Sequence, residues 1–249
     1  MISPLQYFKI PPTSADAGTL ALAIAFILVG YLTYLCWTPP NSNPLGPTAA
    51  LPRDHIGINT GAIQARRFIT LSLWVLHAII AVYYPSPPVV ICPNPDNLSS
   101  SLFTWSTYTT VVLTTIVIVA PIRLLAFRQL GQNFTFRLAK PKELVKSGLY
   151  SYVQHPSYPT NWLILASNVA LLLRLDGILG CVLPSWVVSW AMWSGGFMVW
   201  PALLIVLGLL GLYGIWVRVK DEEAMLKREF GKEWEEYHWR TKRFIPGVF

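Results

Sequence analysis

Two groups of polar residues, separated by a long apolar stretch, could do chemistry together. One is the turn 155–158 (His-Pro-Ser-Tyr) with Tyr150 before it, and the other is Arg218 with Glu222. Residues 159–217 between them are almost wholly apolar, so the chain can join the two groups only by folding this stretch back on itself. The sequence therefore predicts one polar site at the face of an apolar, membrane-embedded region.

Arg218 and Glu222 lie four residues apart, which places them on the same face of a helix. A guanidinium can hold a carboxylate through two parallel hydrogen bonds, and a glutamate attracts cationic groups. Structural interpretations stay open, because an arginine at the end of a span commonly anchors it at the interface. Glu222 and Glu223 could equally be acids in the first turn of an exposed helix, and His155 could simply close a turn before its proline.

The composition is that of an integral membrane protein. Hydrophobic residues make up 53% of the 249 residues and charged residues 12%, whereas charged residues make up about 25% of ordinary soluble domains. The net charge of +7 requires no nucleic-acid partner, because basic residues at the cytoplasmic face are expected and also suit anionic lipid headgroups.

Uncharged runs indicate the spans. A crossing needs about 20 apolar residues, and three such runs occupy residues 18–37, 68–95 and 97–122. The first run is too long for a cleaved signal peptide and is expected to be a retained anchor. Residues 159–217 leave room for two more crossings, roughly 159–173 and 197–217.

We therefore expect an all-α, multispanning membrane helical bundle of about five transmembrane helices. Residues 180–196 form a re-entrant or interfacial segment in this scheme, and an amphipathic cytoplasmic helix ends the chain. The expected division is an N-terminal transmembrane region of three spans, residues 1–127, and a catalytic region with two spans, residues 128–249.

The placement of basic residues predicts the orientation. Residues 38–67 carry Arg53, Arg66 and Arg67, and residues 123–146 carry six more basic residues, whereas the loop 85–101 carries none. By the positive-inside rule the two basic segments face the cytoplasm and the loop faces the lumen.

The cysteines give no sign of a disulfide framework or a metal centre. Cys36, Cys92 and Cys181 are few, odd in number and scattered, so the sequence predicts neither a disulfide framework nor a metal site.

An ordered set of motifs in the second half of the chain resembles those of a known family. The pieces are Gly131-Gln132-Asn133-Phe134, residues 144–150, the turn 155–158, Arg218 with Glu222-Glu223, Phe230-Gly231 and Tyr237. Together they resemble the isoprenylcysteine carboxyl methyltransferase family and the wider membrane phospholipid-methyltransferase-like group, over roughly residues 128–246.

The resemblance implies a carboxyl O-methyltransferase that uses S-adenosylmethionine to methylate the C-terminal carboxylate of a prenylated cysteine. It implies an endoplasmic reticulum membrane enzyme whose active site faces the cytoplasm, with membrane lipids and a prenylated protein or other lipophilic carboxylate as partners. Arg218 is then the catalytic and substrate-binding residue. The residues implied to bind the cofactor are Lys142, Glu143, Leu144, Val145, Tyr150, His155, Pro156, Ser157, Tyr158 and Glu222.

Three departures from the family pattern bear on the acceptor. Gln154 stands where an arginine usually precedes His-Pro, Thr160 stands where a glycine usually follows, and the region before Arg218 is longer. A methyltransferase for a phospholipid amine or another lipophilic small molecule, and a non-enzymatic lipid-binding protein, therefore remain as alternatives. The chain has no Gly-x-Gly-x-x-Gly loop, so nothing indicates the soluble Rossmann methyltransferase fold.

Overall fold

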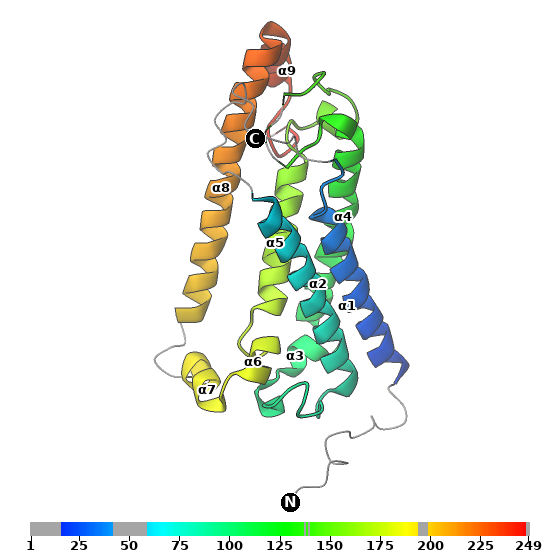
Figure 1. Ribbon diagram of the computed structural model, residues 1–249, viewed down its shortest axis with the longest axis vertical. Coiled ribbons are helices and arrows are strands. Elements are labelled where there is room, and N and C mark those ends of the chain that lie inside the picture. Colours follow the sequence, from blue (N-terminus) through cyan, green and yellow to red (C-terminus); the bar gives the residue numbers. More distant parts are fainter. Residues whose placement is uncertain (1–15, 42–58, 137, 139, 194–198, 248–249) are drawn as a thin grey trace, which may run out of the picture.

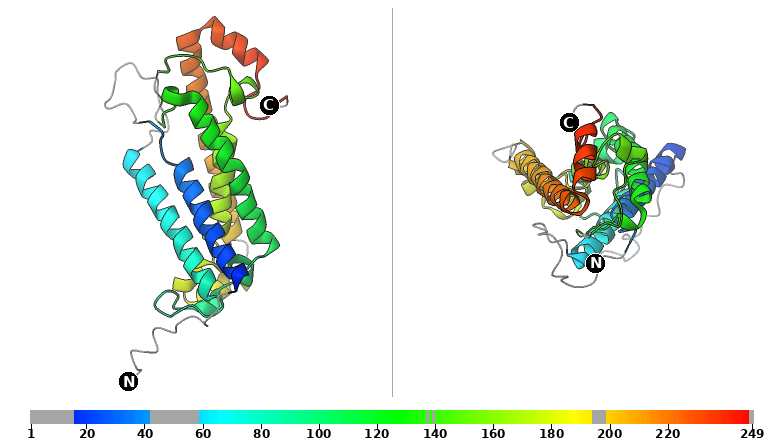
Figure 2. Two further views of the ribbon diagram at one scale, coloured as in Figure 1. Left: turned by 90° about the vertical axis from the view of Figure 1, so that its right-hand side faces the viewer. Right: turned by 90° about the horizontal axis from the view of Figure 1, so that it is seen from above.

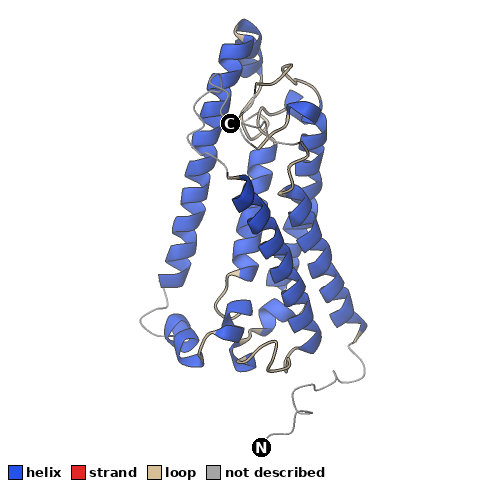
Figure 3. Cartoon of the chain, in the orientation of Figure 1, coloured by secondary structure: helices blue, strands red, loops and turns tan. Residues whose placement is uncertain are grey.

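The computed structural model describes residues 16–41, 59–136, 138, 140–193 and 199–247. Arg53 and residues 194–198 of the expected insertion lie outside these ranges. Within them the regular elements are helices (Figures 1 and 3), which confirms the all-α fold class. The α-helices are α1 (Ala17–Cys36), α2 (Thr60–Tyr83), α3 (Ser100–Phe103), α4 (Thr107–Leu130), α5 (Ser157–Leu172), α6 (Ile178–Val182), α7 (Ser185–Trp193), α8 (Val199–Phe230) and α9 (Lys232–Arg240).

Helices α1, α2 and α4 begin at side chains suited to capping. Asp16, Asn59 and Ser106 accept hydrogen bonds from backbone N–H groups in the first turns of α1, α2 and α4, which would otherwise lack partners. These helices and α5 form a bundle (Figure 2) whose core contains the fully buried Phe26 and Ile164. The bundle supplies the rigid frame on which the site is built.

Four helical stretches in the described part of the chain are long and apolar enough to cross a membrane: Ala17–Cys36, Gly61–Tyr83, Ser100–Asn133 and Val199–Phe230. The fifth expected span corresponds to α5, which packs against α4 but has only 16 residues. At a rise of 1.5 Å per residue it is about 24 Å long, shorter than the ~30 Å hydrocarbon core. The multispanning bundle is confirmed, while the count of five crossings stays a prediction.

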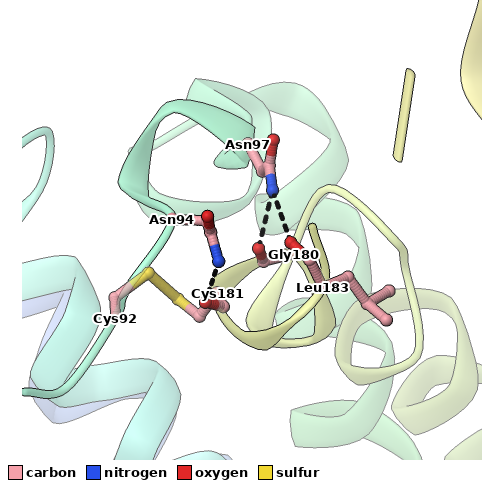
Figure 4. The surroundings of a disulfide bond; sticks show 6 residues. All are labelled: Cys92, Asn94, Asn97, Gly180, Cys181 and Leu183. Atoms are coloured by element: carbon pink, nitrogen blue, oxygen red, sulfur yellow. Dashed lines mark hydrogen bonds between the residues drawn. A yellow bond between two sulfur atoms is a disulfide. The ribbon is translucent and has the colours of Figure 1, made fainter. Parts of the chain in front are cut away.

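A disulfide bond corrects the prediction made from the cysteines. Cys92, in the loop between α2 and α3, is bonded to Cys181 of α6, at a sequence separation of 89 residues (Figure 4). The prediction was wrong because the pairing depends on α6 folding back against the α2–α3 loop, which residue spacing does not reveal. Cys36 is the free cysteine of the described residues, buried in α1.

Amide side chains reinforce the same end of the bundle, which we call the disulfide end. Asn94 donates to the carbonyl of Cys181 (3.2 Å), and Asn97 donates to the carbonyls of Gly180 (2.9 Å) and Leu183 (3.0 Å), as Figure 4 shows. A Cβ at Gly180 would meet the Leu175 carbonyl oxygen at 2.7 Å, so the close approach requires glycine there. Over its described residues, the expected insertion is thus a pair of short helices, α6 and α7, of which α6 is fastened to the α2–α3 loop at the disulfide end.

Candidate functional site

A cavity of about 370 Å³ lies at the other end of the bundle, which we call the site end. Side chains from α2, α4, α5, α8 and α9 line it, together with the connection between α4 and α5. The turn 155–158 reaches it from the start of α5, and Arg218 and Glu222 reach it from α8. The structure therefore brings the two polar groups of the sequence together by folding the apolar stretch back on itself.

Most of the residues singled out in the sequence line this cavity. They are Glu143, Leu144, Val145, Tyr150, His155, Ser157, Tyr158, Arg218 and Glu222. Two others are absent from the lining. Lys142 is exposed and directs its ammonium group to the side-chain carbonyl of Gln132 (3.1 Å), and Pro156 is buried as the N-cap residue of α5.

Tyr158 and Glu222 form the direct link between the two groups. The Tyr158 hydroxyl donates to Glu222 Oε2 at 2.8 Å, and His155 Nδ1 lies 3.8 Å from the same oxygen. Arg218 is 8% exposed and donates from Nη2 to the Phe136 carbonyl at 2.7 Å. A carboxylate and a guanidinium thus stand one helical turn apart on the cavity wall.

Glu223 carries a second set of contacts beside the cavity. Its carboxylate is buried and accepts hydrogen bonds from Arg243 Nε (2.5 Å) and Nη2 (3.1 Å) and from Lys220 Nζ (3.4 Å). His155 Nε2 lies 3.7 Å from the same carboxylate. The hydrogen bond to Glu223 raises the pKa of Arg243, so this guanidinium stays charged.

The two substituted motif positions have local roles in this chain. The amide of Gln154 donates to the Thr241 carbonyl and accepts from His238 Nδ1 (2.9 Å), so it fastens the C-terminal segment to the turn. Burial lowers the pKa of His238, which favours its neutral form. The Thr160 hydroxyl donates to the Ser157 carbonyl (3.0 Å) within the first turn of α5.

Two buried phenols hold Tyr150 between α9 and α4. The Tyr237 hydroxyl donates to the Tyr150 carbonyl at 2.7 Å, and the Tyr150 hydroxyl donates to the Ala126 carbonyl at 3.3 Å. Burial raises the pKa of both groups, so they act as neutral hydrogen-bond donors rather than bases.

Two further residues of the cavity wall were not anticipated. Arg123 of α4 is buried and donates to the carbonyls of Cys36 (3.0 Å) and Ser157 (2.6 Å). Trp234 of α9 is 6% exposed and stacks on His238 with ring centroids 4.4 Å apart. The signal for Arg123 was a charge at the edge of an apolar run, interpreted only as a topology marker. Trp234 had no signal beyond the helical spacing of its apolar neighbours.

Comparisons with known proteins bear on the family that the motifs resemble. The model of the isoprenylcysteine carboxyl methyltransferase (ICMT) family matches residues 111–195, a stretch that contains α5 and the turn before it. A Protein-S-isoprenylcysteine O-methyltransferase of Dictyostelium discoideum is 27% identical over 132 residues. That alignment covers 51% of this chain and 44% of the relative, so the chain matches less than half of the relative's length. The resemblance drawn from the motifs is confirmed.

Proposed function

We propose that the chain is an integral membrane, S-adenosylmethionine-dependent methyltransferase that methylates the C-terminal carboxylate of a prenylated cysteine. The observation that carries the proposal is the cavity itself, because one space is lined by His155, Ser157 and Tyr158 of the turn and by Arg218 and Glu222 of α8. The similarity to the isoprenylcysteine methyltransferases supports the reaction class.

The lining of the cavity fits this cofactor. S-adenosylmethionine carries a sulfonium, an amino acid head and an adenine ring, which call for carboxylates, hydrogen-bonding groups and aromatic surface. Glu143 and Glu222 supply carboxylates, and Tyr150, Tyr158 and Trp234 supply aromatic surface. When bound, the cofactor supplies an electrophilic methyl group.

Helix α8 orders the parts of the cavity along its axis. Ile215, Arg218, Glu222 and Leu226 all line it, and four helical residues rise about 6 Å. An apolar end, a guanidinium, a carboxylate and a second apolar end therefore follow one another. In this arrangement Arg218 binds the acceptor carboxylate, Ile215 adjoins its lipid tail, and Glu222 adjoins the cationic part of the cofactor.

Methyl transfer to a carboxylate needs no strong general base from the protein. A carboxylic acid has a reference pKa near ~4, so the acceptor is ionised at cytoplasmic pH. Methyl transfer would form a bond between a carboxylate oxygen and the methyl carbon, would break the bond between this carbon and the cofactor's sulfur, and would move no proton. Arg218 fixes the carboxylate, the bundle excludes water, and Tyr158 orients Glu222 through its hydrogen bond.

The lipid tail has a route from the bilayer. From Val199 to Trp216, α8 exposes apolar side chains on most of its surface, and nothing lies within 4 Å of a Cβ built at Gly208. Ile63 of α2 and Ile215 of α8 both line the cavity, so it adjoins the space between these two helices. We propose that the prenyl chain enters between them while the cofactor enters from the water-facing end.

The proposal includes an orientation. Arg66 and Arg123, one from each basic segment, line the cavity of the site end, and the disulfide lies at the opposite end, as Figure 1 shows for α6 and α9. Disulfides form in oxidising compartments such as the lumen of the endoplasmic reticulum. Both facts support an endoplasmic reticulum protein with its site facing the cytoplasm.

A binding and transfer experiment tests the function. Detergent-purified protein is titrated with S-adenosylhomocysteine, and transfer of a labelled methyl group is then measured to a farnesylated cysteine and, separately, to phosphatidylethanolamine. We expect binding and a base-labile methyl ester on the cysteine substrate. Labelling of phosphatidylethanolamine alone would show that the acceptor is an amine lipid and not a prenylated cysteine. If the folded protein does not bind S-adenosylhomocysteine, the proposal that it is a methyltransferase is refuted.

A further inference from the structure

The last segment of the chain passes directly behind the turn 155–158. The backbone N–H of Gln154 donates to the Lys242 carbonyl (2.8 Å), and that of His155 donates to the Arg243 carbonyl (2.9 Å). Val153 and Lys242 form an isolated parallel bridge. The position of His155 is therefore set by the backbone of a segment nearly ninety residues further along the chain.

The side chain of Arg243 reaches the other half of the site. It donates to both oxygens of Glu223, which is 6% exposed and therefore depends on partners for its charge. Glu223 also faces His155 Nε2, a buried nitrogen that has no hydrogen-bond partner. One residue, Arg243, thus contacts the turn through its backbone and α8 through its guanidinium.

The other polar groups near Glu223 are less suited to joining α8 to the turn. Lys220 approaches it at 3.4 Å, but its side chain is 45% exposed and lies on α8 itself, so it joins no second element. Gln154 is uncharged, and its amide is already bonded to the C-terminal segment. The link between α8 and the turn through Glu223 therefore relies on Arg243.

We infer that Arg243 is a positioning residue that holds Glu223 against His155 and so keeps the two halves of the cofactor site aligned. The inference rests on the proposed function, because it takes His155 and Glu222 as cofactor ligands. Arg243 is not in the cavity wall, so it acts through Glu223 and the turn rather than by touching a bound molecule.

The test compares three variants in the full-length, detergent-purified protein. Arg243→Gln removes the charge, Arg243→Lys keeps it without the planar fork, and Arg240→Gln removes a neighbouring exposed cation whose Nε donates to the backbone carbonyl of Glu236 in its own helix (3.3 Å). Dissociation constants for S-adenosylhomocysteine are measured by calorimetry, and thermal melting is followed in parallel.

We expect Arg243→Gln to weaken binding about tenfold, Arg243→Lys to recover part of that loss, and Arg240→Gln to bind like the wild type. In steady-state kinetics the glutamine variant raises KM for S-adenosylmethionine more than it lowers kcat. A general loss of packing would not produce partial recovery of affinity in Arg243→Lys. It would also not raise KM more than it lowers kcat.

Wild-type affinity in a folded Arg243→Gln protein overturns the inference. If the glutamine variant does not fold, Arg243→Lys decides: weaker binding at an unchanged melting temperature supports the inference, and unchanged binding overturns it. Failure of the wild type itself to bind S-adenosylhomocysteine refutes the proposed function instead, so the two failures are distinguishable.

Discussion

The disulfide end and the site end of the bundle are held together by different forces. At the disulfide end a covalent bond and uncharged amide-to-carbonyl hydrogen bonds from Asn94 and Asn97 join the α2–α3 loop to α6. At the site end ion pairs join distant segments, such as Lys146 with Glu233 (2.6 Å) and Arg243 with Glu223 (2.5 Å). A covalent cross-link suits a part that only has to stay closed, whereas charged contacts suit the part that we propose receives a charged ligand.

The largest expected effect is on the disulfide end. Replacing Cys181 by serine opens the link between two segments 89 residues apart. Removal of a native disulfide typically costs about 2–4 kcal/mol, so we expect a clear fall in the free energy of unfolding. Thermal melting of the detergent-purified variant measures it.

The same variant tests whether the two ends are independent. Its affinity for S-adenosylhomocysteine, measured below the melting transition, should match that of the wild type. The control is Cys36→Ser, which leaves the disulfide intact. A loss of affinity as large as that of a site variant would show that the two ends are coupled.

The next effect concerns the carboxylate and imidazole of the site. Glu222→Ala removes the partner of the Tyr158 hydroxyl, and His155→Ala removes the ring between Glu222 and Glu223. A charge-assisted hydrogen bond contributes roughly 1.5–3 kcal/mol, so cofactor affinity should fall about tenfold to a hundredfold. Calorimetric titration decides this, with melting temperatures near that of the wild type.

Glu229→Ala is the matched control for these two variants, because Glu229 lies on α8 like Glu222 but pairs with the exposed Lys140 of the α4–α5 connection. It should bind S-adenosylhomocysteine like the wild type. Unchanged affinity in both Glu222→Ala and His155→Ala would remove the cofactor assignment.

A smaller effect separates acceptor binding from cofactor binding. Arg218→Lys keeps a cation at the end of the apolar part of α8 but loses the planar fork, so turnover should fall about tenfold while cofactor affinity stays nearly constant. Initial rates with a farnesylated cysteine measure it. Near-normal turnover would return Arg218 to the role of an interfacial anchor.

The sequence predicted the parts of the molecule that depend on local pattern. Apolar runs located α1, α2, α4 and α8, and the spacing of Arg218 and Glu222 placed both on one wall of the cavity. Contacts between distant segments left no such pattern. The Cys92–Cys181 bond joins segments 89 residues apart, and the Arg243–Glu223 pair depends on how the chain turns back after α9, so residue spacing could not predict either contact.

The smallest expected effect distinguishes two neighbouring tryptophans of α9. Trp234 lines the cavity and is 6% exposed, whereas Trp239 is 87% exposed. One face of the Trp234 ring packs on His238, so an aromatic contact to the cofactor is available only on the cavity side. Aromatic pairs contribute about 0.5–1.5 kcal/mol beyond area burial, which corresponds to roughly twofold to tenfold in affinity. Trp234→Leu should therefore weaken S-adenosylhomocysteine binding by that factor, and Trp239→Leu should leave it unchanged. Calorimetry of the two variants side by side makes the comparison, with 5′-methylthioadenosine as a second ligand that lacks the amino acid head.

An equal loss of affinity for both ligands in Trp234→Leu assigns Trp234 to the adenosine part of the site. No loss of affinity for either ligand excludes Trp234 from the cofactor site.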